Sequence, residues 1–195
     1  EKDTPGFSIG KPLEKMGMNG SVTTDLYFDN VKVDKKNILG EEHDGFKVAM
    51  GLLAGGRITI GAQALGIGEG ALDFTTNYIK ERKQFDKPLA AQQGVQFMVA
   101  EMATKLDAAQ LLIYRAAWLK SNNLPHNKEA SMAKYFASDT SMEVTTNCVQ
   151  LMGGYGYCRE FPVERMMRDC KITQIYEGSN QIQRMIIGRE VIGQF

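Results

Sequence analysis

The sequence predicts a mainly α-helical protein, in which a four-helix bundle follows a short β segment. Apolar residues recur at helical spacing from about residue 44 to residue 152, over long stretches with short connections. The first 40 residues instead show β-type alternation and frequent glycines. Long helices joined by short loops pack most economically as an antiparallel bundle. We therefore divide the chain into the incomplete tail of a β domain, residues 1–40, and a helical bundle domain, residues 41–195.

The N-terminal part is predicted to contain at least one strand. In SVTTDLYFDNVKV (residues 21–33), Val22, Leu26 and Phe28 are candidates for one buried face. One or two strands do not make a stable sheet by themselves. The chain also begins with strand-like and turn-like residues and without Met. We therefore expect a fragment whose N-terminal part, outside this sequence, supplies the rest of the sheet.

The remainder of the chain is predicted to be helical. The first helix covers about residues 44–85 and is broken at Pro88. Its many glycines each weaken a helix by up to ~1 kcal/mol relative to alanine. Close packing against neighbouring helices is the simplest explanation for them. The other helices are expected at residues 92–121, 128–152, 162–169 and 180–192.

Composition narrows the possible classes of function. Lys and Arg total 23, as do Asp and Glu, so the chain has no general electrostatic attraction to nucleic acid or to anionic membranes. No apolar run approaches the roughly 18–20 residues of a transmembrane helix. The three cysteines and two histidines fall in no metal-ligand spacing. We expect no nucleic-acid, membrane or metal partner. The cysteines indicate a reducing compartment, for which we favour the cytoplasm over the mitochondrial matrix.

Glu177 is the first candidate for chemistry. In ITQIYEGSNQIQR (residues 172–184) it lies between an aromatic residue and a glycine, at the start of the last helix. Asn180 and Gln183 fit a capping box there. One reading is a surface acid favoured by the positive end of the helix dipole. The other is a general base, because a carboxylate in an apolar and partly dry pocket accepts carbon-bound protons more readily.

Two further stretches are candidates for anion binding. ERKQFDKPL (residues 81–89) places Arg82 at a helix end, where it either complements the helix dipole or binds a diphosphate, with Phe85 beside an aromatic ring system. QLMGGYGY (residues 150–157) is either a glycine-rich helix stop or a site of close backbone approach to a cofactor phosphate. It is not a GxGxxG fingerprint and no strand precedes it, so a doubly wound nucleotide-binding fold is not supported.

Together these stretches resemble the C-terminal half of the acyl-CoA dehydrogenase family. The resemblance covers nearly the whole chain, and short-chain, butyryl-type members look most similar. It implies an N-terminal helical domain, a middle β domain and a C-terminal four-helix bundle, of which this chain would hold the tail of the second and all of the third. The motifs that occur in family order and spacing are GGRITIGAQALGIGEGALD, RKQFDKPLAAQQ and QLMGGYGYCREFPVERMMRDCKITQIYEGSNQIQR.

The resemblance implies that Glu177 is the catalytic base of an FAD-dependent oxidation. It matches the acid of the family's Tyr-Glu-Gly-Thr/Ser motif, which removes the α-proton of an acyl-CoA thioester while the β-hydrogen leaves as hydride to flavin N5. The backbone N–H of Glu177 would help to polarise the thioester carbonyl. Some members carry the base on the first helix, at the position of Gly56 here. Arg57, Tyr176 and Gly178 are expected to contact the substrate.

The resemblance also implies cofactor contacts and partners. Family enzymes are mostly homotetramers, so we expect a homotetramer, or a dimer, that passes electrons to an electron-transferring flavoprotein. Residues after the base are expected to contact the flavin, and others to reach the FAD of a neighbouring subunit. The first group is Ser179 and Gln181, and the second is Arg82, Gln84, Phe85, Gln150, Gly153 and Gly154.

Several other functions stay open on the sequence. The same residues suit an enoyl-CoA reductase that runs in the opposite direction, or an acyl-CoA oxidase-like enzyme that reduces oxygen. A non-enzymatic alternative is a helical oligomerisation module, against which the retention of Glu177, Arg82 and Gln150 argues. The family's flavin-holding loop and acyl-pocket domain lie outside this sequence. We therefore expect the fragment alone to bind FAD poorly and to be inactive.

Overall fold

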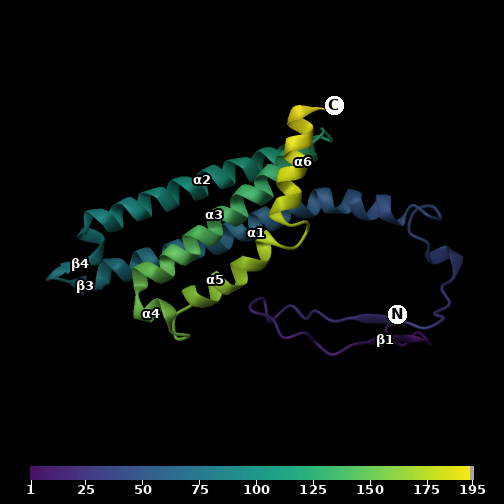
Figure 1. Cartoon of the computed structure of the whole chain (residues 1–195), viewed down its shortest axis with the longest axis horizontal. Coiled ribbons are helices and arrows are strands. Elements are labelled where there is room, and N and C mark those ends of the chain that lie inside the picture. The colour runs from purple at the N-terminus through teal and green to yellow at the C-terminus, as the bar shows by residue number, and fades with distance from the viewer. Residues whose placement is uncertain (194–195) are drawn as a thin grey trace.

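The chain folds as a helical bundle with an extended N-terminal segment (Figure 1). The computed structural model describes residues 1–193, so the last two residues of the predicted domain 41–195 lie outside the described residues. The prediction of a mainly helical fold is confirmed, whereas the boundary at residue 40 stays a prediction. The helices are α1 (Gly45–Glu81), α2 (Gln93–Ser121), α3 (Asn127–Met152), α4 (Gly154–Tyr157), α5 (Val163–Lys171) and α6 (Asn180–Ile192).

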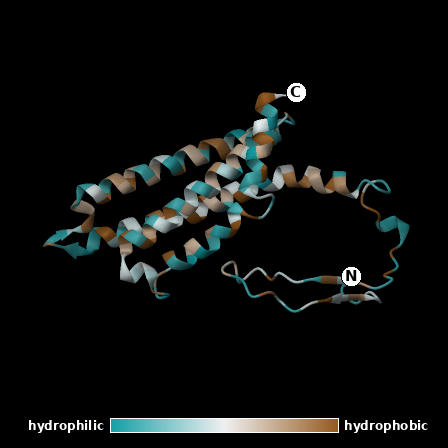
Figure 2. Ribbon diagram, viewed as in Figure 1, coloured by the Kyte–Doolittle hydropathy of each residue, from teal (hydrophilic) through white to brown (hydrophobic). Residues whose placement is uncertain are grey.

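Helix α3 is the centre of the bundle. It packs along α1 and α2, and it also contacts α5 and α6. Helix α6 crosses the end of the bundle where α2 ends and α3 begins (Figure 1). Figure 2 shows hydrophilic and hydrophobic residues alternating along α1, α2 and α3, as expected for helices that bury one face. The fully buried core residues on these helices include Ala64, Ala71, Met102, Ala109, Ala116, Ala130, Ala133, Ala137 and Val144.

Close packing explains some of the glycines of α1 but not all of them. A Cβ atom on Gly61 would lie 3.4 Å from the Ala133 backbone, and one on Gly68 would lie 2.8 Å from the Ser141 hydroxyl oxygen. Close packing against α3 is therefore confirmed for these two positions. A Cβ on Gly66 would meet nothing within 4 Å, so packing does not explain that glycine.

The end of the first helix differs from the prediction. Helix α1 ends at Glu81, and strands β3 (Lys83–Gln84) and β4 (Lys87–Pro88) form a hairpin. The two residues between them, Phe85 and Asp86, have φ angles of +53° and +61°. Two consecutive left-handed residues define a type I′ turn, so this turn, and not the proline, separates the helices. The 3-10 helix η2 (Leu89–Ala91) then leads into α2.

The N-terminal segment holds a two-stranded antiparallel sheet. Strands β1 (Phe7–Ile9) and β2 (Leu26–Phe28) pair with Phe7 opposite Phe28. The prediction that Val22, Leu26 and Phe28 are buried is wrong, because all three are exposed. Among residues 1–193 these strands pair only with each other, so both outer edges of the sheet are unpaired. The 3-10 helix η1 (Lys35–Asn37) lies between β2 and α1.

A loop between the two strands attaches this segment to α5. The Arg168 guanidinium donates to the Met16 carbonyl over 2.7 Å, and the Met18 N–H donates to the Asp169 carboxylate over 2.5 Å. Gly17 lies between these contacts, where a Cβ atom would come within 2.8 Å of the Arg168 backbone. A glycine at position 17 therefore permits the close approach of the loop to α5.

The expectation that no apolar run approaches the length of a transmembrane helix is corrected for helix α1. By length and composition alone it is long and apolar enough to cross a membrane. Core helices of globular proteins pass the same test, and α1 buries Ile58, Ala64, Leu65 and Ala71 inside the bundle. This packing accounts for the apolar residues on the inward face of α1.

Candidate active site

Glu177 lies in a five-residue loop, residues 175–179, between the 3-10 helix η3 (Ile172–Gln174) and α6. Its φ angle is +56°, and that of Gly178 is +89°. A non-glycine residue in this region costs on the order of 1–3 kcal/mol and persists only where the surrounding contacts hold it. The contacts around this loop therefore decide where the Glu177 carboxylate lies.

The Glu177 carboxylate rests against the backbone of α1. A Cβ atom on Gly56 would lie 2.6 Å from its Oε2 atom, so a side chain larger than hydrogen at position 56 would displace the carboxylate. Glu177 itself is half-buried. The structure thus brings together Glu177 and Gly56, which is the position that carries the base in some proteins of the resembled family.

Arg57 supplies a buried positive charge next to this contact. Its side chain is 3 % exposed, and its Nη1 atom donates to Asn127 Oδ1 over 2.6 Å and to Ser131 Oγ over 3.3 Å. Burial lowers the pKa of the Arg57 guanidinium, and attraction to Glu177 and Glu190 opposes that change. Because its guanidinium points into the bundle, the expected contact between Arg57 and substrate stays a prediction.

The residues on either side of Glu177 are anchored to the bundle. The Tyr176 hydroxyl donates to Gln63 Oε1 on α1, and burial raises the pKa of the Tyr176 phenol. The Gly178 carbonyl accepts from Lys134 Nζ over 2.9 Å and from Gln183 Nε2 over 2.8 Å. Tyr176 and Gly178 therefore hold the loop in this structure, and their expected contacts with substrate stay predictions.

The start of α6 is not the predicted capping box. Ser179 is the N-cap residue and makes no side-chain capping bond. Asn180 lies inside the helix, and its side chain bonds Lys134, Ser138 and Asp139 instead. Gln183 turns toward the loop carbonyls of Glu177 and Gly178. The prediction failed because both side chains form hydrogen bonds with other groups instead of capping bonds.

These contacts leave N–H groups available beside Glu177. Within the described part of the chain, residues 1–193, no oxygen accepts a hydrogen bond from the Glu177 N–H. The first N–H groups of α6 have no side-chain cap either. N–H groups at a helix start favour an oxygen that carries negative charge. The loop thus places a carboxylate and unused donors side by side.

A second group of predicted residues lies at the opposite end of α3. Arg82, Gln150, Gly153 and Gly154 line one cavity of about 470 Å³. The Arg82 guanidinium lies 5.8 Å from the centre of the Tyr155 ring. Gly153 ends α3 with a φ angle of +60°, and a Cβ on either glycine would meet nothing within 4 Å. Gly153 therefore stops α3, and both glycines leave open space above the backbone.

The other predicted cofactor residues lie elsewhere. Gln84 and Phe85 belong to the β3–β4 hairpin, and the Phe85 side chain is 84 % exposed at its tip. Ser179 and Gln181 line a different cavity, of about 590 Å³, beside Asp139. Asp139 and Gln150 are eleven positions apart on α3, which corresponds to about 17 Å of helix. One end of the bundle thus holds the Glu177 loop, and the other holds the Arg82 cavity.

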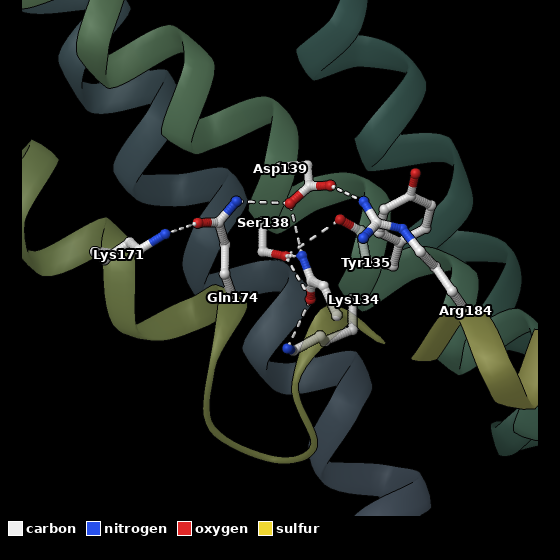
Figure 3. A network of polar contacts seen from close by, with 8 residues as sticks. Lys134, Tyr135, Ser138, Asp139, Lys171, Gln174 and Arg184 are labelled. Atoms are coloured by element: carbon white, nitrogen blue, oxygen red, sulfur yellow. Dashed lines mark hydrogen bonds and ion pairs between the residues drawn. The ribbon is translucent and has the colours of Figure 1, made fainter. Parts of the chain in front are cut away.

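The sequence analysis missed three residues around Glu177. Lys134 and Asp139 belong to a polar network on α3 (Figure 3), and Gln63 holds Tyr176 from α1. Lys134 carries a signal that could have revealed it. It falls at helical spacing between the apolar positions Ala130 and Ala137, on the inward face of its helix.

The described residues contain no cluster of metal-ligating side chains. Among residues 1–193, no group of three or more His, Cys, Asp or Glu side chains lies close enough together to hold a metal ion. The expectation of no metal site stays a prediction.

Comparisons with known proteins fit this arrangement. Residues 43–192 match the family model described as the C-terminal domain of acyl-CoA dehydrogenase. The chain is 50% identical over 192 residues to the NADH-dependent acryloyl-CoA reductase of Anaerotignum propionicum, covering 98% of this chain and 49% of the relative. It is similar to the solved butyryl-CoA dehydrogenase of Megasphaera elsdenii, with 50% identity and a TM-score of 0.97 over 99% of this chain and 50% of that one.

A second solved structure is similar over the whole chain. A chain in the structure described as the electron transferring flavoprotein of Acidaminococcus fermentans is 52% identical, with a TM-score of 0.98. The match covers 100% of this chain and 51% of that chain. In each of these comparisons, the present sequence spans about half the length of the protein it matches.

Proposed function

The chain belongs to the acyl-CoA dehydrogenase family, and we propose that the whole protein is an FAD-dependent enzyme that removes two hydrogens from short-chain acyl-CoA thioesters. The product would be the trans-2-enoyl-CoA. The observation that carries this proposal is the position of Glu177. Its carboxylate is half-buried against Gly56, on a left-handed turn, beside an N–H group that has no acceptor within the described chain.

The residues of the loop suit the removal of an α-proton. A thioester carbonyl that accepts a hydrogen bond from the Glu177 N–H would carry more of the negative charge that develops when the α-proton leaves. The Glu177 carboxylate takes that proton, and the β-hydrogen leaves as hydride. The positive charge of Arg57, buried next to Gly56, is attracted to the Glu177 carboxylate. Exclusion of water by the bound substrate strengthens each of these interactions.

The second end of the bundle fits the cofactor that the family implies. Arg82 and Gln150 provide a cation and an amide around one cavity, and the open space over Gly153 and Gly154 lets a ligand approach the backbone. This donor set suits a diphosphate. Ser179 and Gln181 line the other cavity and would contact the cofactor near Glu177. When bound, FAD supplies the acceptor for the hydride.

The proposal is tested by product analysis on the full-length protein. FAD-loaded protein is incubated with butyryl-CoA and a dye that accepts electrons, and the thioesters are identified by mass spectrometry. Crotonyl-CoA is the expected product, because a short acyl chain is supported by the similarity to a butyryl-CoA dehydrogenase. If butyryl-CoA and its longer homologues are all recovered unchanged, the protein is not a dehydrogenase of this class.

The reductase direction is a second candidate, favoured by one comparison. The similar protein of A. propionicum is named for the reduction of acryloyl-CoA by NADH. The residues that remove an α-proton also return it in reverse, since the transition state is shared. Crotonyl-CoA with a reduced dye measures this direction in the same preparation. Oxygen consumption in the absence of dye separates an oxidase-like activity from both.

We also propose a homo-oligomer, a tetramer or a dimer, that exchanges electrons with an electron-transferring flavoprotein. The similarity to a chain in such a flavoprotein structure supports the electron partner. The oligomer is supported by an exposed apolar stripe on α2. Light scattering of the full-length protein tests it, and a Trp118→Glu variant should form a smaller species if the stripe is the interface. The stripe consists of Phe97, Leu111, Tyr114 and Trp118, each at least 59 % exposed.

A cytoplasmic location remains our proposal. It is supported by Cys148, Cys158 and Cys170, which are all free thiols, as expected of a reducing compartment. Fractionation of the producing cells tests it directly, and recovery in a mitochondrial matrix fraction would favour the alternative location.

A further inference from the structure

Lys134 is a buried cation with an unusual set of partners. Its side chain is 0 % exposed, and its ammonium donates to the Gly178 carbonyl and to Asn180 Oδ1, each over 2.9 Å. Within residues 1–193, no carboxylate forms an ion pair with it. Burial lowers the pKa of Lys134 to about 8, with attraction from Asp139 and Glu177 and repulsion from Arg57 as smaller influences.

A neutral side chain would avoid the cost of burying this charge. Replacing buried ionic groups by apolar ones of similar volume is often neutral or stabilising. Lys134 is therefore not explained by stability alone. What it does achieve is a contact with the carbonyl directly after Glu177, in the strained part of the loop.

Asp139 holds the same loop at both ends. Its Oδ1 atom accepts from Gln174 Nε2 over 2.6 Å, immediately before the loop, and from Asn180 Nδ2 over 2.7 Å, immediately after it. Its Oδ2 atom accepts from Arg184 over 3.0 Å. Figure 3 shows these side chains converging on the surface of α3. One carboxylate oxygen thus fixes the distance between the two ends of the loop.

We propose that Lys134 and Asp139 form a clamp on α3 that sets the direction of the Glu177 carboxylate. Asp139 joins the two ends of the loop, and Lys134 binds the carbonyl of Gly178. These contacts keep the left-handed turn at Glu177, so that its carboxylate stays against Gly56. Both are positioning residues, because neither contacts the reacting atoms. The inference rests on the proposed role of Glu177 as base.

The structural part of the clamp is tested without any assay of activity. Hydrogen exchange is followed by mass spectrometry on the full-length protein and on its Lys134→Met and Asp139→Ala variants. The expected result is faster exchange confined to a peptide that covers residues 172–184. A Met102→Ala variant is the control, because Met102 is a buried core residue of α2. It should lower the temperature of unfolding without changing exchange in that peptide.

The catalytic part is tested with the same variants loaded with FAD. Each single variant should lower kcat for butyryl-CoA by about 10- to 100-fold, because a displacement of about 1 Å at the reacting atoms has effects of that order. KM should change much less. The kinetic isotope effect of α-deuterated substrate should rise, since proton removal becomes slower. The double variant should lose little more than the worse single one, because both side chains hold one loop.

The outcomes separate the clamp from the proposed function. Unchanged exchange in residues 172–184 of both variants overturns the clamp. Faster exchange with unchanged kcat and isotope effect also overturns it, because the direction of Glu177 would then not depend on these contacts. If Lys134→Met does not fold, Asp139→Ala alone decides between these results. If the parent protein neither turns over butyryl-CoA nor exchanges the α-proton of the substrate, the proposed function fails. The clamp is then tested by backbone hydrogen exchange in residues 172–184 alone, which shows whether Lys134 and Asp139 hold the loop.

Discussion

Two regions along α3 hold their functional residues in different ways. At the end near α6, the Glu177 loop is fixed by buried polar side chains, among them Lys134 and Asn180. At the other end, Arg82 lies over the aromatic ring of Tyr155, and Gly153 leaves its cavity open. The first arrangement suits one small reacting group that must point in one direction. The second suits a large ligand whose binding is completed by other parts of an assembly.

The aromatic rings at the second end form a cluster of their own. Tyr155 lies edge-on to Phe161, with ring centres 5.4 Å apart, and Tyr78 contacts both rings at 6.3 Å. Such pairs are worth about 0.5–1.5 kcal/mol each beyond burial. They keep the glycine-rich turn in place without using hydrogen-bond donors. Within residues 1–193, no hydrogen-bond acceptor is paired with the side-chain donors of Arg82 and Gln150, whereas Lys134 donates to the loop.

The Gly56→Ala variant should have the largest effect, because it displaces the Glu177 carboxylate. The new methyl group would meet Glu177 Oε2, and displacing the carboxylate should lower kcat of the full-length enzyme by about 100-fold. Stability should not fall, because alanine favours a helix over glycine by up to ~1 kcal/mol and the displaced group is a flexible side chain. Steady-state kinetics and thermal unfolding are measured together.

Gly66→Ala is the matched control for that variant. Gly66 lies on the same helix, and a Cβ there meets nothing within 4 Å. It should gain similar helix stability and keep its kcat. Equal kinetics for the two variants would show that the Glu177 carboxylate does not need the space over Gly56.

Arg82→Met should affect the second end only. A hydrogen bond to a charged group contributes about 1.5–3 kcal/mol, so loss of the guanidinium should weaken FAD binding by about tenfold or more. Once saturated with FAD, the variant should show the parent's isotope effect, because Asp139, which holds the Glu177 loop, lies about 17 Å along α3 from Gln150 of the Arg82 cavity. Fluorescence titration of the apoprotein with FAD measures the affinity.

Lys80→Met serves as the control for charge. Lys80 lies in the last turn of α1 and does not line the cavity of Arg82. Similar losses of FAD affinity in both variants would assign the effect to the general charge of the helix end and not to the Arg82 cavity.

The sequence predicted the helices more accurately than the contacts between them. Four of the five predicted helices begin and end within two residues of those observed, because apolar spacing and glycine stops are local signals. The hairpin at Phe85 was missed, because no Asn-Gly or Gly-Gly pair announces its type I′ turn. Asn180 and Gln183 were assigned to a local cap, since no local signal reveals that Asn180 bonds Lys134 and Asp139 and that Gln183 bonds the carbonyls of the Glu177 loop.

The candidate site shows the same difference between residues that local motifs reveal and residues that depend on tertiary contacts. Glu177, Arg82 and Gln150 were predicted from motifs that the resemblance supplied. Lys134 was not, because a lysine in a helix is normally solvated. That it is buried depends on α6 crossing the end of the bundle, which is a property of the tertiary fold (Figure 1).

The last prediction concerns the dependence of stability on pH. Burial lowers the pKa of Lys134 to about 8 from its ordinary value of 10.5. Between these values the unfolded chain binds more protons than the folded one, so stability should rise with pH from about 8 to 10.5. One proton contributes at most about 1.4 kcal/mol per pH unit. Urea unfolding across this range, compared with Lys134→Met, isolates the effect, and parallel curves for the two proteins would contradict the buried charge.

The central claim is that Glu177 removes a proton from the substrate. It is tested most directly by anaerobic titration of the FAD-loaded full-length protein with butyryl-CoA, with the Glu177→Gln variant beside it. The absorbance of the oxidised flavin should fall in the parent and stay unchanged in the variant, which keeps the size of the side chain but loses its basic oxygen. Equal loss of absorbance in both proteins would place the base elsewhere and contradict the account.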